Sequence, residues 1–167
     1  MAEKPEGKGA LWVSGLLAAS MWLVMAWQLR VLTPGPVALQ LTWDAETFGR
    51  IIHLWSPEDL ALYRRFLLVD YAVLLAYGVF GWLLATRTRL FASLSSRLQR
   101  LARLCLPLAA ALDALENAFH GWLTEMPRFD ADLIYQLSAL CAALKWGLIL
   151  GFGVLLMWAI ASAVADD

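Results

Sequence analysis

Four polar residues recur at helical spacing inside one apolar run of the sequence. They are Asp113, Glu116, Asn117 and His120. Steps of three and four residues bring side chains to one face of an α-helix, so this group forms a single polar stripe. Carboxyl groups held in an apolar setting are candidate acids and bases, which makes Glu116 and Asp113 the candidate catalytic residues.

Two other apolar runs carry ionisable groups of their own. Asp70 is followed seven residues later by Tyr77 on the same helical face, and Lys145 lies in the last run. Measured from one end of each run at about 1.5 Å per residue, the ionisable groups of the three runs reach nearly the same depth. We therefore expect Lys145 to pair with Asp113 or Glu116, with Asp70 facing the same space.

Three carboxyl groups facing one ammonium group leave an excess of negative charge in a medium of low dielectric constant. At least one carboxyl group is then expected to stay protonated. Coupled acids of this kind suit proton transfer, or the binding of a cationic or hydroxylated ligand. The same groups would also hold helices together in lipid, where apolar burial gives no drive for helix association. A functional role and a purely structural role both remain open at this point.

The composition decides what kind of chain must position these groups. Of the 167 residues, 61% are apolar and 16% are charged, and the mean hydropathy is +0.64. Soluble domains average about 45–50% apolar and about 25% charged residues, so the composition excludes an ordinary soluble domain and a disordered chain. A net charge of −1 argues against a nucleic-acid partner.

Four apolar runs are each long enough to cross about 30 Å of hydrocarbon as an α-helix. We place the spans at about 11–29, 58–85, 101–124 and 132–163. The sequence therefore predicts an all-α membrane protein, a four-helix transmembrane bundle that forms a single domain over residues 1–167. Gly147, Gly151 and Gly153 favour close helix packing of the last span.

The loop after the first span contains a short amphipathic segment at about 44–55. Asp44 is placed to cap a helix there. Its apolar side chains recur at helical spacing at Phe48, Ile51, Ile52 and Trp55. We expect this helix to lie in the interface of the outer leaflet. Ser56 and Pro57 then begin the second span, and Pro127 closes the third.

Arginines set the expected orientation of the spans. The segment after the second span holds five of them with no acidic residue between, namely Arg87, Arg89, Arg97, Arg100 and Arg103. The positive-inside rule places this segment in the cytoplasm, and both termini with it, because four spans return the chain to its starting side.

Tryptophans mark the two membrane interfaces and two deeper positions. We assign Trp12, Trp82 and Trp158 to the inner interface and Trp27, Trp43, Trp55 and Trp122 to the outer one. Trp22 and Trp146 lie deeper, and we expect them to form the walls of a pocket.

A metal site is the next alternative. Glu116 and His120 lie one helical turn apart, as ligands of a metal ion would. Lys145 at the same depth would repel a cation, so we expect neither a metal nor a cofactor.

Three segments resemble a group of small four-span integral membrane proteins of bacteria without assigned function. The segments are Asp70–Tyr77, Asp113-Ala114-Leu115-Glu116-Asn117 and Leu144-Lys145-Trp146. The resemblance covers most of the chain from about Trp43 onward. It implies the four-span architecture and the inner (cytoplasmic) membrane of a bacterium, and it implies no activity.

Several hypotheses for function follow from these groups. The first is an integral inner-membrane protein whose buried polar pocket binds a lipid-like or amphipathic small molecule, with the helix at 44–55 as its rim. The expected ligand-binding residues are Asp70, Tyr77, Asp113, Glu116, Asn117, His120, Lys145, Trp22 and Trp146. The alternatives are a membrane-embedded enzyme doing acid–base chemistry on a lipid or isoprenoid, a small proton-coupled exporter, and an accessory subunit. The expected partners are membrane lipids, and in addition either a second copy of the chain or a larger membrane complex.

Overall fold

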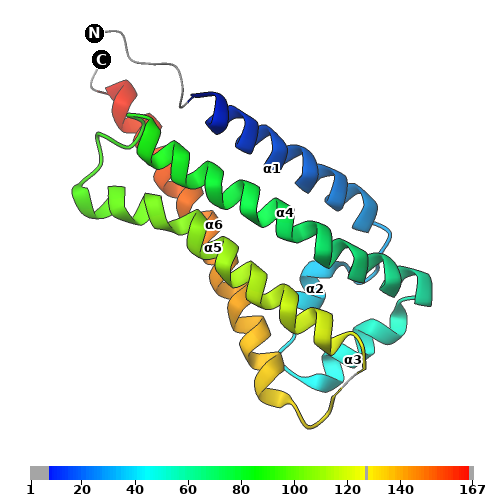
Figure 1. Cartoon of the computed structure of the whole chain (residues 1–167). Helices are drawn as coiled ribbons and strands as arrows, with labels where there is room; N and C mark the ends of the chain where they lie inside the picture. Colours follow the sequence, from blue (N-terminus) through cyan, green and yellow to red (C-terminus); the bar gives the residue numbers. More distant parts are fainter. Residues whose placement is uncertain (1–7, 127, 166–167) are drawn as a thin grey trace.

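The computed structural model describes residues 8–126 and 128–165, and this part of the chain folds into six helices without a strand. Figure 1 shows α1 (Lys8–Leu29), α2 (Pro36–Gln40), α3 (Ala45–Leu54), α4 (Pro57–Arg87), α5 (Ser96–Leu123) and α6 (Asp132–Ala165). The all-helical prediction is confirmed for these residues. Three helices, α1, α4 and α6, are long and apolar enough to cross a membrane. The fourth long helix, α5, is more polar because it carries three arginines and the polar stripe.

Local signals in the sequence account for where the helices begin. At α4, the Ser56 hydroxyl accepts from the backbone N–H of Asp59, whose carboxylate accepts in turn from the N–H of Ser56, with Pro57 in the first turn. Helix α5 starts earlier than the expected residue 101, because the Ser95 hydroxyl caps it. The chain bends at Thr33 and Pro34 and then enters α2, which the sequence analysis did not predict. The expected stop at Pro127 lies outside the described residues.

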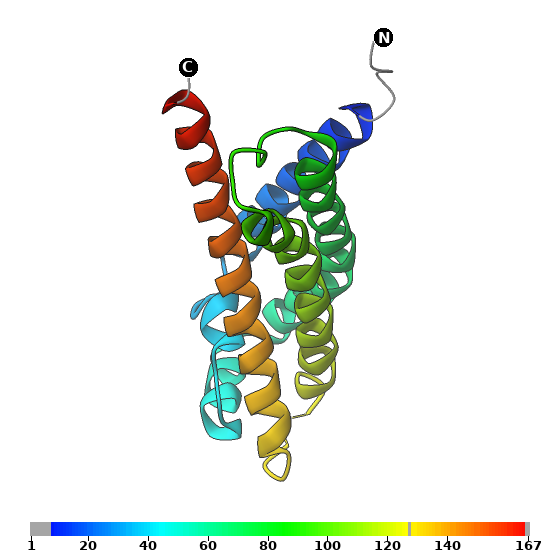
Figure 2. The ribbon, with the colours of Figure 1, turned by 90° about the vertical axis from the view of Figure 1, so that its left-hand side faces the viewer.

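The four long helices pack in a row. Helix α1 packs on α4, α4 on α5 and α5 on α6, whereas α1 does not pack along α6. Both views of the ribbon show α1 beginning and α6 ending at the same end of the molecule, beside the loop between α4 and α5 (Figures 1 and 2). We call this the inner end, and the opposite one, which carries α3, the outer end.

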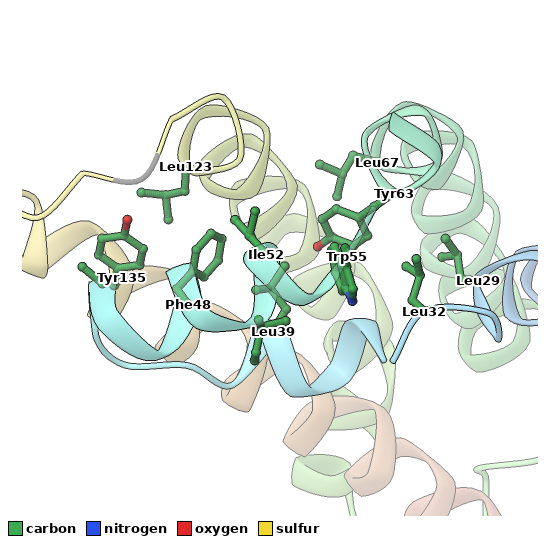
Figure 3. Packing of buried hydrophobic residues seen from close by; sticks show 12 residues of the cluster. Leu29, Leu32, Leu39, Phe48, Ile52, Trp55, Tyr63, Leu67, Leu123 and Tyr135 are labelled. Atoms are coloured by element: carbon green, nitrogen blue, oxygen red, sulfur yellow. The ribbon is translucent and has the colours of Figure 1, made fainter. Parts of the chain in front are cut away.

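The amphipathic helix is present as α3, but its apolar face contacts protein. Asp44 caps it by accepting from the N–H of Thr47 at 2.7 Å, and this hydrogen bond lowers the pKa of the Asp44 carboxyl. The Phe48 ring lies edge-on to the ring of Tyr135 (Figure 3) and to that of His120. The apolar face is therefore buried against the outer ends of α4, α5 and α6, which supply an apolar surface, while the position of this helix at the outer interface stays a prediction.

A second apolar core fills the inner end. The loop between α4 and α5 turns back and buries Phe91 and Leu94, and the Phe91 ring contacts that of Phe152 in α6. Helices α4 and α5 approach closely at Gly81, where a Cβ atom would lie 2.5 Å from the Cβ of Leu106. The glycines expected to pack closely in α6 do not, because in the described structure a Cβ at Gly147, Gly151 or Gly153 would meet nothing within 4 Å.

Helix α5 bends near its middle. Its first turns run in a different direction from the remainder in both views (Figures 1 and 2). Pro107 lies inside the helix, where it has no N–H for the backbone ladder and its ring crowds the preceding turn. The first segment, at 96–106, therefore lies at an angle to the part that carries the polar stripe.

Candidate functional site

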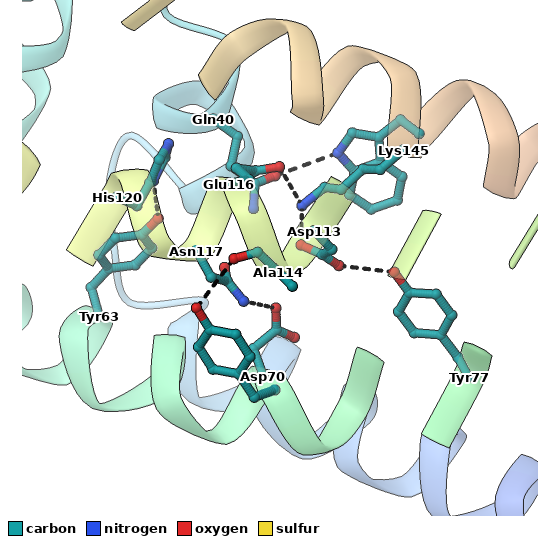
Figure 4. Close-up of polar contacts among 12 residues, drawn as sticks. Gln40, Tyr63, Asp70, Tyr77, Asp113, Ala114, Glu116, Asn117, His120 and Lys145 are labelled. Carbon is teal, nitrogen blue, oxygen red and sulfur yellow. Dashed lines mark hydrogen bonds and ion pairs between the residues drawn. The ribbon is translucent and has the colours of Figure 1, made fainter. Parts of the chain in front are cut away.

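The polar side chains lie between the two apolar cores. Counted from the outer end of α4, α5 and α6 alike, the buried apolar residues of the outer core come first, then the polar groups, then those of the inner core. We define the polar centre as Asp70 and Tyr77 of α4, Asp113, Glu116 and Asn117 of α5, and Lys145 of α6. Figure 4 shows these side chains pointing toward one another from the three helices.

Lys145 holds the polar centre together. Its Nζ lies 2.6 Å from Oδ1 of Asp113 and 2.8 Å from Oε2 of Glu116, and only 3% of the lysine is exposed. The sequence predicted a pair with one carboxylate or the other, and the structure forms salt bridges with both. A charge buried this deeply is costly unless it is paired, so this arrangement satisfies the ammonium group.

The remaining contacts tie α4 to α5. Tyr77 donates to Oδ2 of Asp113 at 3.1 Å, and the side-chain amide of Asn117 donates to Asp70 at 2.7 Å. Asp70 therefore faces the same space as Lys145 but is bound by an amide instead of a cation. Asp70 and Tyr77 are half-buried, whereas the other members of the centre are buried.

Glu116 is the least satisfied member. It is 1% exposed, and its Oε2 lies 2.8 Å from the Lys145 ammonium nitrogen, whereas Oε1 has no hydrogen-bond donor among the described residues. The buried hydroxyl of Ser138 likewise finds no partner there. A buried oxygen without a donor is costly to keep ionised, which makes Glu116 the natural place for a proton or for a ligand's donor group.

His120 lies on the outer side of the polar centre and contacts a residue that the sequence analysis missed. The Tyr63 hydroxyl and Nδ1 of His120 are hydrogen-bonded at 2.5 Å, and both side chains are buried. The spacing could have revealed Tyr63, because it precedes Asp70 by seven residues, as Asp70 precedes Tyr77.

Trp146 joins the surroundings of the centre through a second residue that was not predicted. The indole N–H of Trp146 donates to the side chain of Gln40 in α2 at 3.4 Å, and the ring lies 5.7 Å from Nζ of Lys145. The sequence offers no periodicity that would place Gln40 here, because it belongs to a five-residue helix between two turns.

Trp22 does not belong to the site, contrary to the prediction. It is 54% exposed on α1, which meets α4 through a different stripe that includes Leu11, Ser14 and Ala18. When helices pack in a row, the first helix buries only one of its faces. The position of a residue along a span therefore does not determine whether its side chain points toward the other helices.

Two surface hollows lie away from the polar centre. One of about 410 Å³ is lined by the polar face of α3, with Glu46, Arg50 and His53, and by Phe129. The other, of about 540 Å³, follows the first turns of α4. Helix α3 thus borders a hollow at the outer end, but no member of the polar centre lines either one. Among the described residues, no group of three or more Asp, Glu, His or Cys side chains is arranged to hold a metal ion.

Comparison of the chain with protein families, with curated proteins and with solved structures finds no match. The chemistry of the site therefore has to be inferred from its own geometry.

Proposed function

We propose that the protein crosses the membrane four times, with α5 as the fourth span. From Leu104 onward, every exposed residue of α5 is apolar, and together with Leu101 these residues form a stripe at alternating steps of three and four: Leu101, Leu104, Leu108, Ala111, Leu115, Ala118 and Trp122. The polar stripe of this part of the helix, at 113–120, is buried against the neighbouring helices, where Lys145 compensates the two carboxylates. A helix in a bilayer is expected to turn an apolar face toward lipid and to keep its polar side chains on the face toward protein, where they find partners.

We infer an orientation with the inner end in the cytoplasm, so that both termini are cytoplasmic, in the inner membrane of a bacterium. The five arginines of residues 87–103 lie at this end. Exposed tryptophans support two interfaces, with Trp12, Trp82 and Trp158 toward the inner end and Trp27, Trp43 and Trp122 toward the outer end. Trp55 is buried and takes no part, because its indole N–H donates to the carbonyl of Pro34.

We propose that the polar centre binds the head group of an amphipathic small molecule that carries a positive charge. One observation carries this proposal: a single ammonium group is shared by Asp113 and Glu116, while Asp70 has only an amide partner. If all three carboxyl groups ionise, the centre carries an excess of about two negative charges in a medium where such charge is costly. A proton or a cationic group relieves that excess.

Access from the bilayer is consistent with a lipid-like ligand. Asp70 and Tyr77, the half-buried members, are the groups that a ligand would meet first. Asp70 lies about 20 Å along α4 from Pro57, close to the middle of the helix.

A titration with defined amphiphiles tests this proposal. Dodecylamine and dodecanol have the same apolar chain, and only the amine carries a positive charge at neutral pH. We expect the purified protein to bind the amine more tightly than the alcohol, and Asp70→Asn to abolish that preference. Glu125→Gln is the matched control, because it removes a carboxylate whose side chain is 58% exposed. Equal affinity for the two amphiphiles, or equal losses in both variants, would contradict the proposal.

A second candidate is proton transfer, either for acid–base chemistry on a lipid or for coupled export. The Oε1 atom of Glu116, which has no donor among the described residues, favours it, because a buried carboxyl beside Lys145 can take up and release a proton without leaving its place. Glu116→Gln should then abolish turnover or transport while the protein still folds.

A further inference from the structure

A second charged feature lies at the inner end, away from the polar centre. No acidic residue occurs between Tyr71 and Leu112, whereas five arginines do. All five are exposed: Arg87, Arg89, Arg97, Arg100 and Arg103. Within the described part of the chain none of them forms a salt bridge. The inner end therefore presents positive charge that the described residues do not neutralise.

The first segment of α5, at 96–106, divides its exposed surface into two stripes. Leu101 and Leu104 continue the apolar outer stripe of the helix. Arg97, Arg100 and Arg103 follow at steps of three, so they line one flank of that stripe. Because α5 bends at Pro107, this segment does not share the direction of the spanning part (Figures 1 and 2). Such a segment suits a membrane interface, with leucines toward acyl chains and arginines toward head groups.

The loop that leads into this segment is fixed by the inner core. Phe91 and Leu94 are buried, and the side-chain amide of Gln99 donates to the carbonyl of Leu94 at 2.8 Å. Arg89 therefore belongs to a packed loop that leads into the segment carrying the arginines of α5. The positive surface is part of the fold, because both elements that carry it are anchored to the same core.

We propose that this arginine surface binds the phosphate groups of anionic phospholipids in the leaflet that it faces. A guanidinium group can donate two parallel hydrogen bonds to a phosphate, and it keeps its charge at any accessible pH. Arg97 and Arg103 are about 9 Å apart along the helix axis, which is enough for neighbouring head groups to be held at once. This inference rests on the proposed position of the chain in a bilayer and is independent of any ligand at the polar centre.

Lipid competition tests the inference. The delipidated full chain in neutral detergent is mixed with equal amounts of phosphatidylglycerol and phosphatidylcholine, and the bound lipids are identified by native mass spectrometry. We expect the wild-type chain to retain phosphatidylglycerol preferentially. Each arginine near a membrane surface contributes about a fivefold gain in affinity for anionic lipid, so the triple variant R97Q/R100Q/R103Q should lower the preference on the order of 100-fold.

The control is the triple variant R50Q/R64Q/R65Q, which removes the same charge from exposed arginines at the outer end. It should keep the preference. No preference in the wild type, or equal losses in the two triple variants, would overturn the inference. Asp113→Asn distinguishes the two proposals: it should leave the lipid preference unchanged, whereas the arginine variants should leave dodecylamine binding unchanged.

Discussion

Replacing Lys145 with methionine removes the only cation of the polar centre while keeping an unbranched side chain of similar length. The variant leaves Asp113 and Glu116 buried without a counter-ion, where the wild type has distances of 2.6 and 2.8 Å to the ammonium nitrogen. Removing one partner of a buried ion pair costs about 3–5 kcal/mol. At about 1.4 kcal/mol for each factor of ten, the unfolding equilibrium shifts by two to almost four powers of ten.

The assay is equilibrium unfolding in mixed micelles, followed by tryptophan fluorescence. We expect the lower end of that range, because helices unfolded in a micelle still find polar partners. The control is Arg64→Met, which breaks an exposed salt bridge with Glu125 at 3.3 Å and should cost at most about 1 kcal/mol. Lys145→Met combined with Asp113→Asn should recover part of the loss. If Lys145→Met and Arg64→Met were equally stable, the reasoning about the buried pair would be refuted.

Three further predictions concern other parts of the fold. Glu116→Gln should lower the free energy of unfolding by less than about 1 kcal/mol in the same assay, because Lys145 keeps Asp113 as its partner and an excess negative charge is removed. A decrease as large as that caused by Lys145→Met would contradict this. Gly81→Ala should destabilise by about 1–3 kcal/mol, since its Cβ would meet that of Leu106 at 2.5 Å, whereas Gly147→Ala should be neutral or stabilising. The hydrogen bond from Thr47 lowers the pKa of Asp44, so the capping of α3 by this carboxylate should be complete above about pH 4 and should fade as the pH falls through the lowered pKa. Asp44→Asn should remove this pH dependence of thermal unfolding. An acid transition that is unchanged in the variant would show that the cap does not contribute.

The membership of the polar centre could be anticipated because the face and the depth of each side chain follow from helical geometry. Steps of three, four and seven fix which side chains share a face, and rise per residue fixes their depth. The pairing of Lys145 followed from these two rules, and Tyr63 would have followed had the heptad on α4 been extended by one step.

The features that were missed depend on tertiary packing. Trp22 was placed by depth alone, but the row arrangement leaves most of α1 exposed, and no rule of periodicity determines which helices are neighbours. The amphipathic pattern of α3 was read correctly, yet the same pattern fits burial against lipid or against protein. Gln40 lies in a connection whose path depends on how α2 meets α6. Helices α4 and α5 approach closely at Gly78 and Gly81, whereas the glycines of α6 mark no close approach. This difference also depends on which helices are in contact.

The most direct test of the central proposal is native mass spectrometry of the protein released from its membrane in mild detergent. If the polar centre binds an amphipathic molecule, the wild-type chain should retain a small molecule of defined mass. Asp113→Asn and Glu116→Gln should lose it, while Glu125→Gln should keep it. An empty monomer would contradict ligand binding at the centre. A chain that instead carries another polypeptide, with the same mass in all variants, would identify the protein as a subunit of a larger complex.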